Sequence, residues 1–247
     1  MGATAFCGRG TMIPEVLSFG RTGFGDELLL GAFRTLFIAF FAYTMGILLG
    51  LLGASAKLYG GPLAKAVANF YTTVVRGIPE LVLILFLFFA GTRGISAIGE
   101  AVGYGPIDIN GTLAGILVLG FVQGAYSTEV IRGAIEAVPI GQIEAARAYG
   151  MSPIMAFYRI ILPAMLPNAL PGLSNLWLSV IKDTTLIVVT GSAPELLQYA
   201  KNAAGFTKRY FLFYFVAALI YLAMTLFSNY LLGLLEKRFR RGQARLA

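Results

Sequence analysis

The chain has 247 residues, of which 57% are hydrophobic and 13% charged, and its net charge is +7. A mean hydropathy of +0.77, with apolar runs that exceed the roughly 20 residues needed to cross hydrocarbon, excludes an ordinary soluble domain. There is no histidine and only one cysteine, Cys7, which argues against metal sites, disulfides and histidine-dependent nucleophilic catalysis in a membrane enzyme. The composition therefore predicts an all-α membrane protein, with basic residues that mark topology rather than nucleic-acid binding.

Long apolar stretches predict about five transmembrane helices in a polytopic helix bundle, at residues 27–55, 64–90, 111–135, 167–191 and 210–235. The expected organisation is an N-terminal segment at 1–26, a transmembrane domain at 27–235 with a loop at 137–166, and a basic tail at 236–247. Basic residues favour the cytoplasmic side. The tail and the loop are therefore expected in the cytoplasm and, because the number of spans is odd, the N-terminus is expected outside.

Glycines recur inside the first and third stretches. Lipid provides no hydrophobic force that draws helices together, so small residues serve mainly to let helix backbones approach closely. Plain close packing is therefore the expected role of Gly46, Gly50 and Gly53 in the first stretch and of Gly111, Gly115, Gly120 and Gly124 in the third.

Several side chains in or near the spans are expensive to place in lipid. An ionisable group at membrane depth costs about 2.5–3.5 kcal/mol on insertion scales, so it usually faces a partner or a cavity. On a continuous helix Arg76 and Glu80 share one face, so an ion pair and a substrate contact fit equally well, and the same holds for Glu129 and Arg132. Pro79 frees a backbone carbonyl, as is tolerated beside a cavity. The candidate pathway residues are Arg76, Pro79, Glu80, Glu129, Lys182 and Asp183.

The loop at 137–166 carries the signals of two short helices. The first is expected to stop at Gly150, which suits a left-handed backbone. The second is expected to start with Ser152 as its N-cap and Pro153 as its first helical residue, and to end before Pro163. These signals predict a structured elbow, and an interfacial helix lying on lipid is also compatible with them.

The spacing within this loop carries a resemblance. Glu144-Ala145-Ala146 is followed after three residues by Gly150, then after nine residues by Ile160, and then by Leu162-Pro163. This pattern resembles the EAA signature of ABC importer permeases at every defined position. The resemblance implies a coupling helix that docks on a separate ATPase, through Glu144, Ala145, Ala146, Arg147, Gly150, Ile160, Leu162 and Pro163. The chain contains no Gly-Lys pair, so ATP and Mg are expected on the partner ATPase, with no cofactor in this chain.

Two further blocks resemble those of polar amino acid permeases, in particular the histidine, lysine/arginine/ornithine and opine groups. They are Val75-Arg76-Gly77-Ile78-Pro79 and Lys182-Asp183-Thr184-Thr185-Leu186, with Thr185 where that family usually has serine. The resemblance implies a permease subunit, not itself an enzyme, of a binding-protein-dependent importer for polar, cationic amino acids or opines. Glu80, Glu129 and Asp183 are expected to make its alternating-access pathway acidic enough for a cation.

The same resemblance implies the partners and the location. It places the chain in the bacterial inner membrane with ABC ATPase subunits, an extracytoplasmic substrate-binding protein and a second permease subunit. Because Glu80 follows Pro79, a heterodimer is favoured over a homodimer. A secondary carrier or channel driven by ion gradients is the alternative, but it leaves the EAA spacing unexplained.

Overall fold

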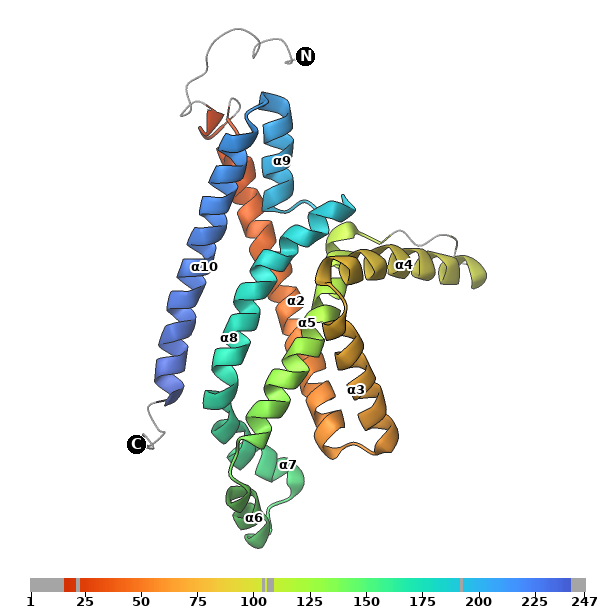
Figure 1. Cartoon of the computed structure of the whole chain (residues 1–247), viewed down its shortest axis with the longest axis vertical. Coiled ribbons are helices and arrows are strands. Elements are labelled where there is room, and N and C mark those ends of the chain that lie inside the picture. The colour runs from red at the N-terminus through yellow and green to blue at the C-terminus, as the bar shows by residue number, and fades with distance from the viewer. Residues whose placement is uncertain (1–15, 21–22, 104, 106–108, 192, 241–247) are drawn as a thin grey trace.

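The computed structural model describes residues 16–20, 23–103, 105, 109–191 and 193–240. Most of the expected N-terminal segment and the last seven residues of the basic tail, 241–247, lie outside the described residues. All regular elements of the described part are helical (Figure 1). They are α2 (Gly25–Tyr59), α3 (Pro62–Gly77), α4 (Glu80–Ala101), α5 (Gly111–Glu136), α6 (Ile140–Ala148), α7 (Pro153–Ala156), the π-helical turn η1 (Phe157–Ile161), α8 (Leu162–Ile187), the 3₁₀ turn η2 (Val188–Thr190), α9 (Leu196–Thr207) and α10 (Tyr210–Arg240).

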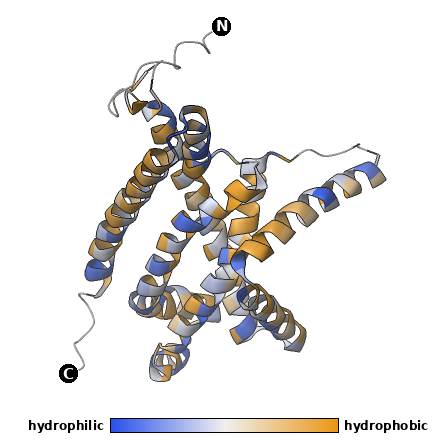
Figure 2. Ribbon diagram, turned by 45° about the horizontal axis from the view of Figure 1, so that its top comes forward, coloured by the Kyte–Doolittle hydropathy of each residue, from blue (hydrophilic) through white to orange (hydrophobic). Residues whose placement is uncertain are grey.

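Five helices of the described part are long and apolar enough to cross a membrane, which confirms the expected polytopic bundle. They are α2, α4, α5, the continuous run Pro153–Thr190 and α10. Figure 2 shows hydrophobic residues along most of α10, with hydrophilic residues at its C-terminal end.

The second expected span was placed wrongly. The stretch at 64–90 is not one helix, because α3 ends at Gly77 and α4 begins at Glu80. Proline lacks an amide hydrogen and disfavours helical backbone in the residue before it, and Ile78 is accordingly extended (φ −98°, ψ 141°). As a result α3 and α4 run in different directions (Figure 1). The loop expected after residue 90 is instead helical as far as Ala101.

Helices α2 and α5 form the closely packed centre of the bundle, as the glycine pattern predicts. A Cβ atom added to Gly50 would lie 2.5 Å from the Ser127 Cβ atom, and one added to Gly46 would lie 2.9 Å from the Gln123 Cβ atom. On the facing helix, a Cβ atom at Gly124 would lie 2.8 Å from the Leu49 Cβ atom. These distances are below normal carbon contacts, so only glycine permits the observed approach of the two backbones.

The end of the bundle that holds α9 is tied together by one buried carboxylate. Glu195 is 0% exposed, caps α9 by accepting from the Gln198 amide at 3.1 Å, and accepts from the Thr35 hydroxyl of α2 at 3.1 Å. It also accepts from the Tyr221 hydroxyl of α10. Burial raises the pKa of Glu195 above its ordinary value, and these hydrogen bonds work in the opposite direction. A single side chain thus joins α2, α9 and α10.

The glycine packing leads to a stability prediction. Gly50→Ala should destabilise the bundle by about 1–3 kcal/mol, because the new methyl group overpacks the contact with α5. Gly233→Ala in α10 is the control, since a Cβ atom there meets nothing within 4 Å and alanine favours helix. Thermal unfolding of the purified protein in detergent should give a lower Tm for the first variant only. Equal Tm values would contradict the packing argument.

The buried carboxylate leads to a pH prediction. Because its pKa is raised in the folded state above the ordinary 4.5, the contribution of Glu195 to stability is present below that pH and is lost as the pH rises through the folded pKa. Glu195→Gln should therefore reduce the fall in Tm between about pH 4.5 and neutral pH. Glu27→Gln, at an exposed position of α2, should leave that slope unchanged. Parallel curves for the wild type and Glu195→Gln would refute this assignment.

Candidate functional site

The elbow expected from the sequence is a folded structure. Helix α6 ends at Ala148, and Gly150 adopts the left-handed conformation (φ +72°) that its position after the helix predicts. The Ser152 hydroxyl accepts from the Met155 amide at 3.3 Å, and Pro153 is the first residue of α7. The expected helix stop, N-cap and first helical residue are therefore confirmed.

The expected helix end before Pro163 is wrong. The chain passes from α7 through the π-helical turn η1 directly into α8, and Pro163 lies in the first turn of α8. In this turn the Leu162 amide donates to the Phe157 carbonyl, five residues earlier. Proline has no amide to donate, so it is tolerated where the helical hydrogen-bond pattern is already shifted. The second half of the elbow is consequently a rigid extension of α8.

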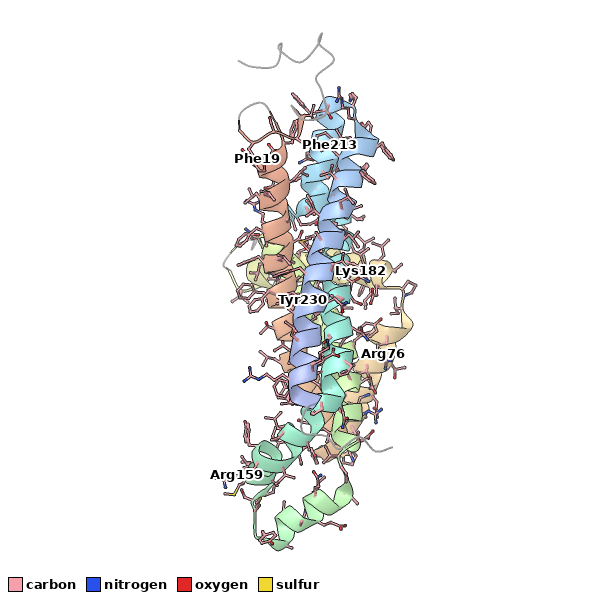
Figure 3. All side chains as sticks on the ribbon, turned by 90° about the vertical axis from the view of Figure 1, so that its left-hand side faces the viewer. Phe19, Arg76, Arg159, Lys182, Phe213 and Tyr230 are labelled. Atoms are coloured by element: carbon pink, nitrogen blue, oxygen red, sulfur yellow. The ribbon has the colours of Figure 1, made fainter. Side chains whose placement is uncertain are left out.

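The loop projects beyond the long helices and presents a mixed polar and apolar surface (Figures 1 and 3). Glu144, Ala145 and Arg147 are exposed on α6, whereas Ala146 is buried. Large apolar side chains lie exposed near them: Tyr149 at 85%, Ile154 at 72% and Tyr158 at 64%. These three residues were not among the predicted coupling residues, although their place within the EAA spacing was a usable signal.

An apolar cluster anchors the loop to the bundle. Val138 precedes α6 and Ile161 lies in η1, and both are buried with Ile131 of α5, Met165 of α8 and Ala54 of α2. A force applied to the loop is therefore passed to α5 and α8, because close-packed interiors transmit strain.

The second group of predicted residues gathers at the break between α3 and α4. The Arg76 guanidinium carbon lies 5.7 Å from the centre of the Tyr126 ring on α5, a cation–π arrangement. Arg76 and Glu80 form no ion pair, although both are among the described residues. The expectation that they share a helix face fails because the helix is interrupted at Pro79.

Two carboxylates face this break from different helices. Glu80 starts α4 and Asp183 lies in α8, and their charges are close enough to repel each other. The Tyr126 hydroxyl interacts with Glu80. Within the described chain neither carboxylate forms an ion pair, and Lys182, the sequence neighbour of Asp183, is exposed. Figure 3 shows Arg76 and Lys182 within the bundle, away from Arg159 in the loop. Neither carboxylate has a cation within ion-pair distance among the described residues, although Lys182 lies near enough to Asp183 to act on its charge.

Glu129 belongs to a different cluster. One of its carboxylate oxygens accepts from Lys57 Nζ of α2 at 2.5 Å, and the other accepts from Arg132 Nη2 at 3.0 Å. The Lys57 ammonium also donates to the Thr72 hydroxyl of α3 at 2.6 Å. Glu129 was predicted together with Glu80 and Asp183, whereas Lys57 and Thr72 were not predicted. No local signal pointed to them, because Lys57 and Glu129 are 72 residues apart.

An open cavity of about 420 Å³ is lined by residues of both clusters, but not by Glu80 or Asp183. It is polar and lies between the ends of α2, α3 and α5. Its lining residues are Lys57, Thr72, Thr73, Arg76, Gly77, Tyr126 and Glu129.

Comparison with known proteins gives consistent relatives. Residues 46–241 match the family described as binding-protein-dependent transport system inner membrane component. The chain is 40% identical over 232 residues to the octopine transport system permease protein OccQ of Rhizobium radiobacter, covering 94% of this chain and 98% of that protein. It is 40% identical over 223 residues to the histidine/lysine/arginine/ornithine transport system permease protein HisQ of Escherichia coli, covering 90% and 97%.

Solved structures agree with these relatives. A crystal structure of an amino acid ABC transporter with histidines superposes with a TM-score of 0.74 at 35% identity, covering 87% of this chain and 95% of that chain. The MetNI methionine ABC transporter in an inward facing conformation has a TM-score of 0.70 at 16% identity, covering 87% and 97%. The second match shows a shared fold alone.

Proposed function

The chain belongs to the family of binding-protein-dependent transport system inner membrane components, and we propose that it carries cationic amino acids or opines through an ABC importer. Membership of this family confirms that the chain is a multi-pass inner-membrane permease component, as its EAA spacing and its two further sequence blocks predict. It also disfavours the alternative of a secondary carrier.

The observation that carries the substrate proposal is the pair of carboxylates at the α3–α4 break. Glu80 and Asp183 repel each other and have no ion-pair partner among the described residues, so a cationic side chain placed between them would relieve that repulsion. Arg76 and Tyr126 lie beside them. A guanidinium binds carboxylates well, so Arg76 suits the α-carboxylate of an amino acid. The permease relatives named for octopine and for histidine, lysine, arginine and ornithine support this class.

We assign ATP hydrolysis to a separate subunit that binds ATP and Mg and docks on the loop. The exposed residues Glu144 and Arg147 supply charged contacts, Tyr149 and Ile154 supply apolar contacts, and Gly150 supplies the sharp bend. Ala145, Ala146, Ile160, Leu162 and Pro163 complete the proposed coupling set. Such a surface, with exposed aromatic and aliphatic groups ringed by charge, is typical of a protein interface rather than of solvent-facing loops.

Alternating access further requires a second permease subunit. Helix α4 diverges from the other long helices (Figure 1) and exposes apolar side chains, for example Phe86 at 65% and Ile98 at 65%. We favour a related rather than an identical partner, together with an extracytoplasmic binding protein that delivers substrate. The loop and the C-terminal end of α10 lie at one end of the bundle, and the start of α2 lies at the other (Figure 1). From the proposed docking role of the loop we infer a cytoplasmic C-terminus and an N-terminus outside.

The coupling assignment is tested at Gly150. Gly150→Val should reduce transport at least tenfold while membrane insertion persists, because a β-branched residue is strongly disfavoured at positive φ. Gly150→Asn is the matched control, since asparagine tolerates the left-handed region, and it should retain most of the transport. Glu144→Lys should also uncouple ATP hydrolysis from uptake. Uptake by proteoliposomes and ATPase activity should be measured together. Wild-type uptake in both Gly150→Val and Glu144→Lys would refute the docking role.

The substrate assignment is tested at Glu80. Removing one charge-assisted contact costs about 1.5–3 kcal/mol, so Glu80→Gln should raise the KM for arginine, lysine or an opine by roughly tenfold or more. Glu100→Gln, an exposed acid on the same helix, should leave the KM unchanged. The measurement is uptake of a panel of amino acids by the complete reconstituted complex. Unchanged uptake of every cationic substrate in Glu80→Gln would remove Glu80 from the pathway.

A further inference from the structure

A ladder of polar side chains follows one face of α5 between the candidate substrate group and the loop. Tyr126, Glu129, Arg132 and Glu136 are spaced by three or four residues, which places them along one side of the helix. Arg132 joins two steps of this ladder, because it donates to Glu129 at 3.0 Å and to Glu136 at 2.7 Å. The ladder therefore spans the part of α5 between the α3–α4 break and the residues that lead into α6.

One member of the ladder, Glu129, is connected to two other helices through Lys57. Lys57 lies in the last turn of α2, its side chain is only 9% exposed, and its ammonium binds both Glu129 of α5 and Thr72 of α3. Arg76 lies one turn beyond Thr72 on α3 and stacks on Tyr126. Two polar contacts thus hold α3 against α5 beside the open cavity. One joins Arg76 to Tyr126, and the other joins Thr72 to Glu129 through Lys57.

The contact between Lys57 and Glu129 is poorly suited to be a substrate site in the observed conformation. Both oxygens of Glu129 are engaged by cations, so a cationic substrate would have to displace Lys57 or Arg132. Removing one partner from a partly buried ion pair leaves an unpaired charge, which is strongly unfavourable. The same property makes the pair a stiff link, because it resists sliding in a way that apolar contacts in a helix interface do not.

We propose that Lys57 and Glu129 form a positioning pair that transmits displacement of the loop, through α5, to α3 and so to the break at Pro79. The proposal rests on the proposed function and deepens it, since it names the residues that join the ATPase-docking surface to the substrate pathway. The path begins at α6, enters the C-terminal end of α5 through the apolar cluster around Val138 and Ile135, crosses at Glu129 and Lys57, and continues along α3 from Thr72. Neither residue touches substrate in this account.

The test is the coupling ratio, the number of ATP molecules hydrolysed per substrate molecule transported by the complete complex in proteoliposomes. Lys57→Met and Glu129→Gln should each raise this ratio at least about fivefold. A fivefold change corresponds to the lower end of the free energies that typically couple two sites. Both should still co-purify with the ATPase and retain its basal activity. Because the two residues act as one unit, the double variant should be no worse than either single variant.

Two controls separate positioning from general damage. Glu136→Gln removes only the exposed end of the ladder, where the side chain is 49% exposed, and surface pairs contribute little, so its coupling ratio should equal that of the wild type. Lys57→Arg keeps the charge and should restore most of the coupling lost in Lys57→Met. If the neutral variants fail to assemble, Glu129→Asp decides, because its shorter side chain keeps the charge but cannot reach Lys57 as closely, so the coupling ratio should still rise measurably.

Several results would overturn the proposal. A wild-type coupling ratio in assembled Lys57→Met and Glu129→Gln, with only a lower Tm, would make the pair purely structural. A raised KM with an unchanged ratio would instead make Glu129 a substrate contact. Failure of the proposed function would give a different result. A wild-type complex that does not transport cationic amino acids but transports others would refute the substrate class. The coupling ratio could then still be measured with the transported substrate.

Discussion

The bilayer offers no hydrogen-bond partners, so each charged side chain and each freed backbone group of this chain must be satisfied by the protein or must face an aqueous space. The structure meets this constraint in two ways. Lys57, Glu129 and Arg132 satisfy one another across helices. Glu80 and Asp183 do not, and they lie at the one place where a proline interrupts a predicted span. The first arrangement joins α2 to α5, and the second is the site that we propose for a cationic substrate.

The same constraint explains why the centre of the bundle is so tight. In lipid, helices associate through close packing rather than through hydrophobic burial, and the α2–α5 interface achieves this with glycines whose replacement would bring atoms within 3 Å of the facing helix. The loop is fastened to this centre through Val138 and Ile161. A displacement of the loop would therefore reach α5 and α8 first, whereas α3 and α4 join the centre through apolar residues such as Val75 and Leu83 and through the polar contact of Arg76.

The fold and the loop were largely predictable, because their signals are local. Hydropathy over about 20 residues locates a span, and a glycine after a helix or a serine before a proline acts on its immediate neighbours, as Gly150 and Ser152 do. Helix ends were predicted wrongly where two local sequence signals compete. Pro79 ended a helix that hydropathy favoured continuing, whereas Pro163 failed to end one because η1 had already shifted the hydrogen-bond pattern.

The sequence by itself determined the class of protein, the number of spans and the loop with its family spacing, since each depends on composition or on short fixed intervals. Only the tertiary structure decided which polar groups meet across helices. Lys57 finds Glu129 across 72 residues, and Glu195 finds Tyr221 and Thr35 on two other helices. Such pairings depend on how helices rotate and approach one another. That is set by packing across the whole bundle, and no interval along the chain encodes it.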